Sequence, residues 1–115
     1  MHNESKIKHI NSITEVDQLL NSGKITVIDF SAEWCGPCKM LGPRFEKVAN
    51  DTKHNNINFI KIDVDSAKEL ANKYEIQSIP TLIYFNKKGK EVKKTFGLVA
   101  EKDINNIIEE IEKEK

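Results

Sequence analysis

The sequence has few cysteines, no surplus of charge of either sign and no long apolar run. Its 115 residues include two cysteines and three prolines, and 18 basic residues are balanced by 18 acidic ones. Two cysteines are too few for a multi-bridge disulfide scaffold. A chain without net positive charge is poorly suited to neutralising a phosphate backbone. We therefore expect neither a fold held by several disulfides nor a nucleic-acid partner.

Membrane and secretory segments are also missing from the sequence. No apolar stretch approaches the ~20 residues of a membrane-spanning helix, and the longest β-like run, Ile79 to Phe85, contains Pro80 and Thr81. The first nine residues lack the apolar segment of a secretory signal. We expect a cytoplasmic protein with no membrane partner. Its length predicts one domain, residues 1–115, with one sizeable core.

The apolar periodicity predicts strands that alternate with helices. The predicted order is strand 7–10, helix 13–21, strand 25–30, helix 35–50, strand 57–64, helix 67–74, strands 81–85 and 91–96, and a C-terminal helix with apolar residues at 104, 107, 108 and 111. Ser12 and Glu15 have the spacing of a capping box, and Asp65 or Ser66 is the expected N-cap of helix 67–74.

The predicted sheet is mixed. The run from Ile25 to Phe30 is apolar nearly throughout, which is typical of a central strand buried on both faces. Strand–helix–strand units imply parallel pairing, whereas the turn over Asn86 to Gly89 implies an antiparallel hairpin. The sequence therefore predicts an α/β fold with helices on both faces of a mixed sheet.

The cysteines lie at the junction of the central strand and the long helix, in the segment Trp34-Cys35-Gly36-Pro37-Cys38. We expect Cys35 in the first helical turn and exposed, where free backbone N–H groups and the helix dipole favour a thiolate. Cys35 is then the nucleophile. Cys38, one turn later and covered by helix and sheet, is the resolving thiol. Gly36 permits the tight ring, and Pro37 costs no helical hydrogen bond there.

Two other interpretations of the cysteine pair remain open. A zinc site needs two more ligands, yet His2, His9 and His54 lie in polar or terminal segments without paired spacing, so we expect no metal. The cysteines could also be two structural thiols. The strand-to-helix junction and the Gly-Pro insert favour redox chemistry.

The segment from Asp29 to Met40 resembles the active-site segment of the thioredoxin family. The resemblance continues at Pro43, at Lys61 to Asp65, at Ile79 to Thr81 and at Phe96-Gly97, while Ser31 and Gly42 depart from the family pattern. It implies the thioredoxin fold, a three-layer α/β/α arrangement with a central mixed sheet flanked by four helices. It also implies a protein dithiol–disulfide oxidoreductase that works through a reversible Cys35–Cys38 disulfide.

The resemblance also implies the partners. A protein of this family reduces disulfides in client proteins and is itself re-reduced by thioredoxin reductase. No cofactor is bound, because the electrons come from NADPH through the reductase. We expect a monomer.

Asp29 stands in an otherwise apolar strand, and two interpretations apply. It could be a carboxylate at the strand end that caps a loop. The resemblance instead implies a buried acid beneath Cys38, with a pKa raised by desolvation so that it exchanges a proton with that thiol. Lys61, on a neighbouring strand, is the partner of this acid by resemblance; otherwise it is a lysine at a strand edge.

Pro80 opens a strand, where a trans proline is awkward. By resemblance the Ile79–Pro80 bond is cis and faces the disulfide; the alternative is a trans proline that merely starts the strand. The resemblance also implies a shallow apolar surface that binds an extended client peptide, with Trp34 exposed on it rather than in the core. Its members are Trp34, Val64, Ile79, Pro80, Gly97 and Leu98.

Three rival functions need weighing. A glutaredoxin would carry Pro-Tyr in place of Gly36-Pro37 and a Gly-Gly turn after Pro80. A disulfide isomerase domain would carry His in place of Pro37, together with a signal and a retention tail. A scaffold or processivity subunit of the same fold, in which the cysteines are incidental, is the alternative of another class.

Overall fold

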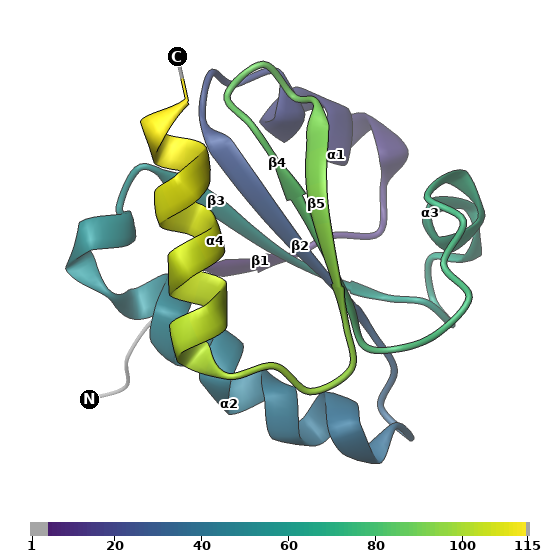
Figure 1. The fold of residues 1–115 in the computed structure, drawn as a ribbon. Coiled ribbons are helices and arrows are strands. Elements are labelled where there is room, and N and C mark those ends of the chain that lie inside the picture. The colour runs from purple at the N-terminus through teal and green to yellow at the C-terminus, as the bar shows by residue number, and fades with distance from the viewer. Residues whose placement is uncertain (1–4, 115) are drawn as a thin grey trace.

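The structure, a computed structural model, describes residues 5–114. His2 and the start of the N-terminal segment therefore lie outside the described residues. The elements are β1 (Ile7–His9), α1 (Ile13–Leu20), β2 (Ile25–Ser31), α2 (Gly36–Asn50), the 3₁₀ helix η1 (Thr52–His54), β3 (Ile57–Asp63), α3 (Lys68–Lys73), β4 (Thr81–Phe85), β5 (Glu91–Phe96) and α4 (Glu101–Lys113). The predicted order is confirmed, and only η1 was not predicted (Figure 1).

The strands described here form one five-stranded sheet in the order β1-β3-β2-β4-β5. Both β1 and β2 pair parallel with β3, while β4 runs antiparallel to β2 and β5 antiparallel to β4. All seven residues of β2 are buried. The prediction of a mixed sheet with residues 25–30 at its centre is confirmed, and β1 and β5 are the two edges.

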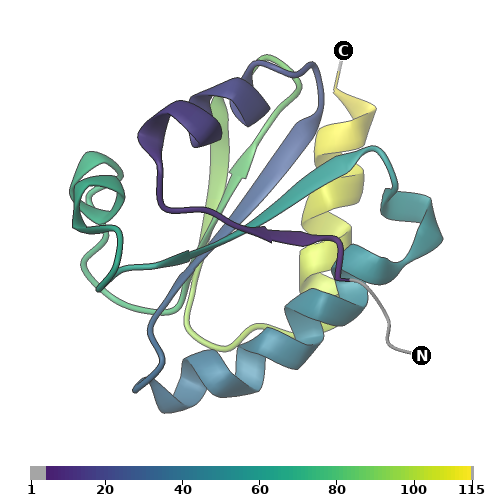
Figure 2. The same ribbon diagram turned by 180° about the vertical axis from the view of Figure 1, so that it is seen from behind.

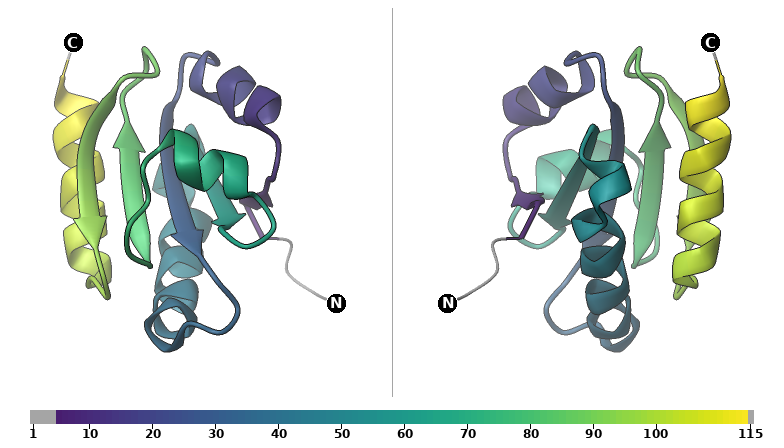
Figure 3. Two further views of the ribbon diagram at one scale, coloured as in Figure 1. Left: turned by 90° about the vertical axis from the view of Figure 1, so that its right-hand side faces the viewer. Right: turned by 90° about the vertical axis from the view of Figure 1, so that its left-hand side faces the viewer.

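Helices cover both faces of the sheet (Figures 2 and 3). Because side chains alternate along a strand, Val27 packs in the cluster that contains Phe45 of α2 and Ile108 of α4. Its neighbour Ile28 packs in the cluster with Leu20 of α1 and residues of α3. This is the three-layer α/β/α arrangement of the thioredoxin fold. Within residues 5–114, no helix is both long and apolar enough to cross a membrane.

The predicted start of α3 is wrong in detail. Its N-cap is Ala67, which makes no side-chain capping bond. The carboxylate of Asp63 instead accepts hydrogen bonds from the backbone N–H groups of Asp65 (2.8 Å) and Ser66 (3.3 Å). The end of β3 thus forms its own turn before the helix begins. By contrast, the capping box is confirmed, because Ser12 Oγ accepts from Glu15 N at 3.3 Å.

The β4–β5 turn requires glycine at one position. The Asn86 side chain accepts from Lys88 N and Lys90 N, each at 3.0 Å. Gly89 has φ +78°, and a Cβ there would lie 2.7 Å from the carbonyl oxygen of Leu20. The predicted turn is confirmed, and it packs against the end of α1.

His54 does not lie in a polar environment, contrary to the sequence interpretation. It is 1% exposed, and its Nε2 lies 2.8 Å from Asn105 Oδ1 on α4. Its ring also lies beside that of Phe59, with centroids 6.1 Å apart. The short η1 helix turns the imidazole inward, so His54 is part of the packing between η1, β3 and α4.

Candidate active site

Cys35 caps the N-terminus of α2. Its backbone is extended (φ −88°, ψ 115°), the helix begins one residue later at Gly36, and Pro37 stands within the first two helical positions. The Cys38 backbone N–H donates to Cys35 Sγ at 3.2 Å. A sulfur at this position receives a hydrogen bond and faces the positive end of the helix dipole, which favours the thiolate. The helix therefore begins one residue later than predicted, and Cys35 is its N-cap rather than a residue of its first turn.

Cys35 and Cys38 form a disulfide, with their Cα atoms 5.2 Å apart. The exposed fractions of the two residues are 5% and 4%. The expected exposure of Cys35 is therefore wrong. Ala32 is buried with the two cysteines, and Val64 and Ile79 pack against this cluster. What distinguishes Cys35 from Cys38 is its capping position at α2, not a larger exposed area.

The segment around Pro80 lies beside Cys35. Cys35 Sγ is 3.9 Å from the carbonyl oxygen of Ile79, and the Ile79–Pro80 bond is cis. The Gly97 N–H donates to the Pro80 carbonyl oxygen at 2.9 Å, which holds the end of β5 against this segment. Leu98, next along the chain, is 39% exposed. The fold thus brings three distant segments together near the disulfide.

Trp34 is 70% exposed, so the core interpretation of this residue is excluded. Its indole Nε1–H donates to Asp65 Oδ2 at 2.8 Å. Asp65 is a site residue that the sequence reasoning missed, because it was considered only as a helix cap. The available signal was its place in the Lys61–Asp65 segment that carries the family resemblance.

Two exposed apolar side chains near the site were also missed. Met40 on α2 is 58% exposed and Phe96 at the end of β5 is 64% exposed. Phe96 pairs in register with Thr81, the residue after Pro80. Its sequence signal is weak, because a single aromatic residue on an edge strand is common.

Asp29 lies within β2 and is 1% exposed. Its Oδ1 has no hydrogen-bond partner among the described residues. Burial raises the pKa of this carboxyl to about 6, and the positive charge of Lys61 opposes part of the rise. The two residues are partners in the β2–β3 register, so their side chains stand on the same face of the sheet.

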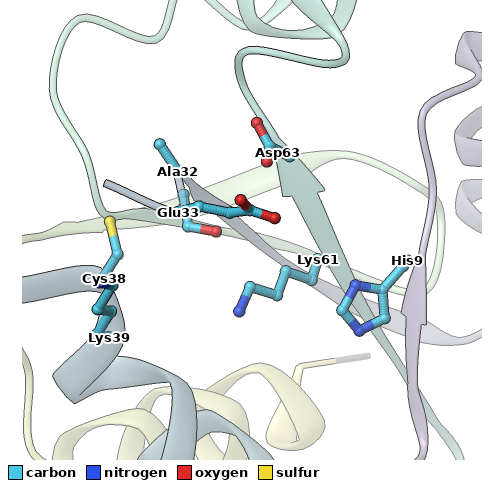
Figure 4. A pocket seen from close by; sticks show the side chains of 8 residues that line it. His9, Ala32, Glu33, Cys38, Lys39, Lys61 and Asp63 are labelled. Atoms are coloured by element: carbon cyan, nitrogen blue, oxygen red, sulfur yellow. The ribbon is translucent and has the colours of Figure 1, made fainter. Parts of the chain in front are cut away.

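Two hollows that share Lys61 and His9 in their linings lie beside Cys38 and beside Asp29. One, of about 320 Å³, is lined by Cys38, Lys61 and His9 (Figure 4). The other, of about 310 Å³, is lined by Asp29 and again by Lys61 and His9. The Lys61 ammonium lies 4.0 Å from the place that a Cβ on Gly42 would occupy.

This arrangement can carry out thiol–disulfide exchange. Within residues 5–114, no three or more His, Cys, Asp or Glu side chains are grouped so that they could hold a metal ion. The cysteine pair instead occupies a helix N-terminus. Such a pair on a mixed sheet with helices on both faces defines the thioredoxin-fold disulfide oxidoreductases.

Comparison with known proteins identifies the family. The family model Thioredoxin matches residues 7–110. A thioredoxin of Mycoplasmoides gallisepticum is 47% identical over 102 residues, which cover 89% of this chain and 99% of that protein. Thioredoxin-2 of Saccharomyces cerevisiae is 45% identical over 92 residues, or 79% of this chain and 86% of its own. A mutant thioredoxin of Halobacterium salinarum has a similar solved structure, with TM-score 0.85, 32% identity and 99% of each chain covered.

The chain therefore belongs to the thioredoxin family and is a protein dithiol–disulfide oxidoreductase. The thioredoxin fold expected from the resemblance is confirmed by the same comparisons. Nothing in them favours the scaffold alternative.

Proposed function

We propose that this protein is a general reductant of disulfides in cytoplasmic client proteins. It acts as a monomer of one domain and is re-reduced by thioredoxin reductase with electrons from NADPH. The observation that carries the proposal is Cys35 at the N-cap of α2 with Cys38 one turn later. The relatives that bear the name thioredoxin support disulfide-containing clients and a thioredoxin reductase as the partners.

Cys35 makes the first attack. In the reduced protein its thiolate attacks one sulfur of the client disulfide, and the second client sulfur leaves as a thiolate. The Cys38 N–H and the α2 dipole stabilise the negative sulfur before the attack. Gly36 and Pro37 keep the turn tight and leave that N–H directed at the sulfur.

Cys38 completes the cycle. Its sulfur attacks Cys35 Sγ, so that the Cys35–Cys38 bond forms, the mixed disulfide breaks and the client leaves as a second thiolate. Asp29 takes the proton that Cys38 loses. An acid with a pKa of about 6 is mostly ionised at neutral pH and still returns its proton readily. Lys61 holds the carboxylate charge in the buried strand.

The client binds on the apolar surface around the disulfide. Its members are Trp34, Val64, Ile79, Pro80, Gly97 and Leu98. A shallow surface of this kind accepts many extended segments without selecting one side chain. The Ile79 carbonyl beside Cys35 Sγ offers the client backbone a hydrogen-bond acceptor. The Asp65 bond to Trp34 holds the indole in place at the edge of the surface.

An insulin-reduction assay tests the proposal. The protein should accelerate precipitation of insulin by dithiothreitol, and should do the same with thioredoxin reductase and NADPH as the reductant. Acceleration in neither assay would support an incidental cysteine pair and refute the proposal. Acceleration by dithiothreitol alone would refute the reductase route.

Trapping of clients tests the order of the two cysteines. Cys38→Ser should accumulate mixed disulfides through Cys35 because the resolving step is lost. Cys35→Ser is the matched control and should trap almost nothing. Equal yields of trapped insulin chains from the two variants would show that the assigned order is wrong.

A further inference from the structure

Three titratable side chains form one row across the sheet. Lys61 of β3 pairs in register with Asp29 of β2 on one side and with His9 of β1 on the other. Residues paired in this way place their side chains on the same face, and adjacent strands are about 4.8 Å apart. The row therefore runs from the centre of the sheet to its edge.

Exposure increases along this row. Asp29 is 1% exposed, Lys61 is partly exposed and His9 is exposed at the edge strand. Figure 4 shows Lys61 directed toward α2 and Cys38, with the imidazole of His9 on the other side of Lys61. The buried end of the row carries a carboxylate oxygen without a hydrogen-bond partner among residues 5–114.

Both hollows that border the row reach His9. The hollow at Cys38 and the hollow at Asp29 have volumes of about 320 and 310 Å³. Each has room for several water molecules, since one occupies about 30 Å³ in the liquid. Lys61 and His9 line both hollows. The two side chains common to both hollows are therefore those that lie between Asp29 and the exposed edge of the sheet.

We propose that His9 is the outer end of a proton path that leads from Asp29 past Lys61 to bulk water. The path rests on the proposed function, because it requires that Asp29 take the proton of Cys38. The resolving step is complete only when this proton moves on from Asp29, because a protonated Asp29 can return it to the Cys38 sulfur. The imidazole accepts the proton and gives it to bulk water, and no electrons move in this transfer. His9 touches neither sulfur and acts on the resolving step only through Asp29.

The charges around the imidazole permit this role. His9 also borders further hollows beside those two. Together these hollows are lined by Lys8 of its own strand, by Lys39 of α2 and by four further acidic groups: Glu15, Glu33, Glu46 and Asp63. These carboxylates come from α1, α2, β3 and the loop after β2. They outnumber the lysines around the imidazole. Imidazole is also the side chain that ordinarily exchanges protons near neutral pH.

The test compares His9→Gln with Lys8→Gln. Lys8 is the exposed neighbour on β1 and lines neither of the two hollows at issue, so it serves as the matched control. Stopped-flow tryptophan fluorescence with insulin as the client separates the first attack from the resolving step. We expect His9→Gln to slow the resolving step by about 3- to 10-fold near neutral pH, less than the roughly 10²- to 10⁴-fold contributed by a direct general base. Lys8→Gln should change neither step.

Two further measurements distinguish a proton path from a structural role. Free imidazole added to His9→Gln should restore the resolving rate. The double variant with Asp29→Asn should be no slower than Asp29→Asn alone, because both residues serve one path. An unchanged resolving rate in His9→Gln, a loss that imidazole does not restore, or additive losses in the double variant would each overturn the proposal.

The Asp29→Asn variant separates this inference from the function on which it rests. If Asp29→Asn slows resolution and His9→Gln does not, only the role of His9 is overturned. If Asp29→Asn leaves resolution unchanged, the proposed proton acceptor is wrong, and the path is overturned with it. In either case the trapping experiment with Cys38→Ser still reports on the cysteine chemistry.

Discussion

Replacing Asp29 with asparagine should change how the stability of the folded protein depends on pH. The carboxyl is buried in β2, and its pKa rises from an ordinary 3.8 to about 6. A difference of about two units between the folded and unfolded states corresponds to about 3 kcal/mol once the acid is ionised in both. This free energy favours unfolding, because the unfolded chain releases the proton more easily.

The sign of the effect follows from the raised pKa. Well below pH 3.8 the acid is protonated in both states, and its ionisation contributes nothing to the free energy of unfolding. As the pH rises from 3.8 through 6, the folded state loses stability, and above pH 6 the whole loss is present. Asparagine stays neutral throughout. The stability gained by Asp29→Asn should therefore be about 2 kcal/mol larger at pH 7 than at pH 4, which is about 8 °C in Tm for a chain of this length.

Urea denaturation of the oxidised protein at the two pH values measures this difference. Any cost of burying the amide is the same at both and cancels. Asp17→Asn, at a carboxylate on α1 whose side chain is 48% exposed, controls for loss of a surface charge. An Asp29→Asn effect of equal size at pH 4 and pH 7 would show that this carboxyl does not carry a raised pKa in the folded protein.

The remaining predictions concern three glycines and the reactive thiol. Gly42→Ala should stabilise the protein by about 0.5–1 kcal/mol in thermal unfolding, because a mid-helix glycine is replaced and the new Cβ makes only an ordinary contact; a lower Tm would contradict this. Gly89→Ala should cost about 2 kcal/mol or more, because the strained φ adds to a clash with Leu20. Gly23→Ala has the same kind of φ with no described atom within 4 Å and should cost only about 1 kcal/mol; equal losses would refute the clash. Less than one equivalent of iodoacetamide should label Cys35 of the reduced protein first in peptide mapping, since it alone caps α2; equal labelling of both thiols would refute the assignment.

The fold was predictable because its signals are local. The apolar run from Ile25 to Phe30 marked the central strand, and the turn over Asn86 to Gly89 marked the hairpin. The position of Cys35 at a strand-to-helix junction was predictable in the same way, to within one residue. Each of these patterns lies within a single element, where spacing alone determines which side chains share a face.

Contacts between distant segments were not predictable from spacing. Asp65 binds the indole of Trp34 across 31 positions, and Asn105 meets His54 across 51. The burial of Cys35 likewise depends on Val64 and Ile79, which come from other parts of the chain. Neither periodicity nor composition carries information about such pairs, because they arise only when the layers pack together.

The two edges of the sheet affect whether the protein aggregates with partly unfolded clients. An unpaired strand edge is a template on which another extended chain can add and aggregate. Here β1 is only three residues long and carries Lys8, while β5 carries Lys93 and Lys94. The short length of β1 and the lysines on both strands make the two edges poor templates. An incoming extended chain is thus discouraged from adding along the sheet and is left to dock at the apolar surface around the disulfide.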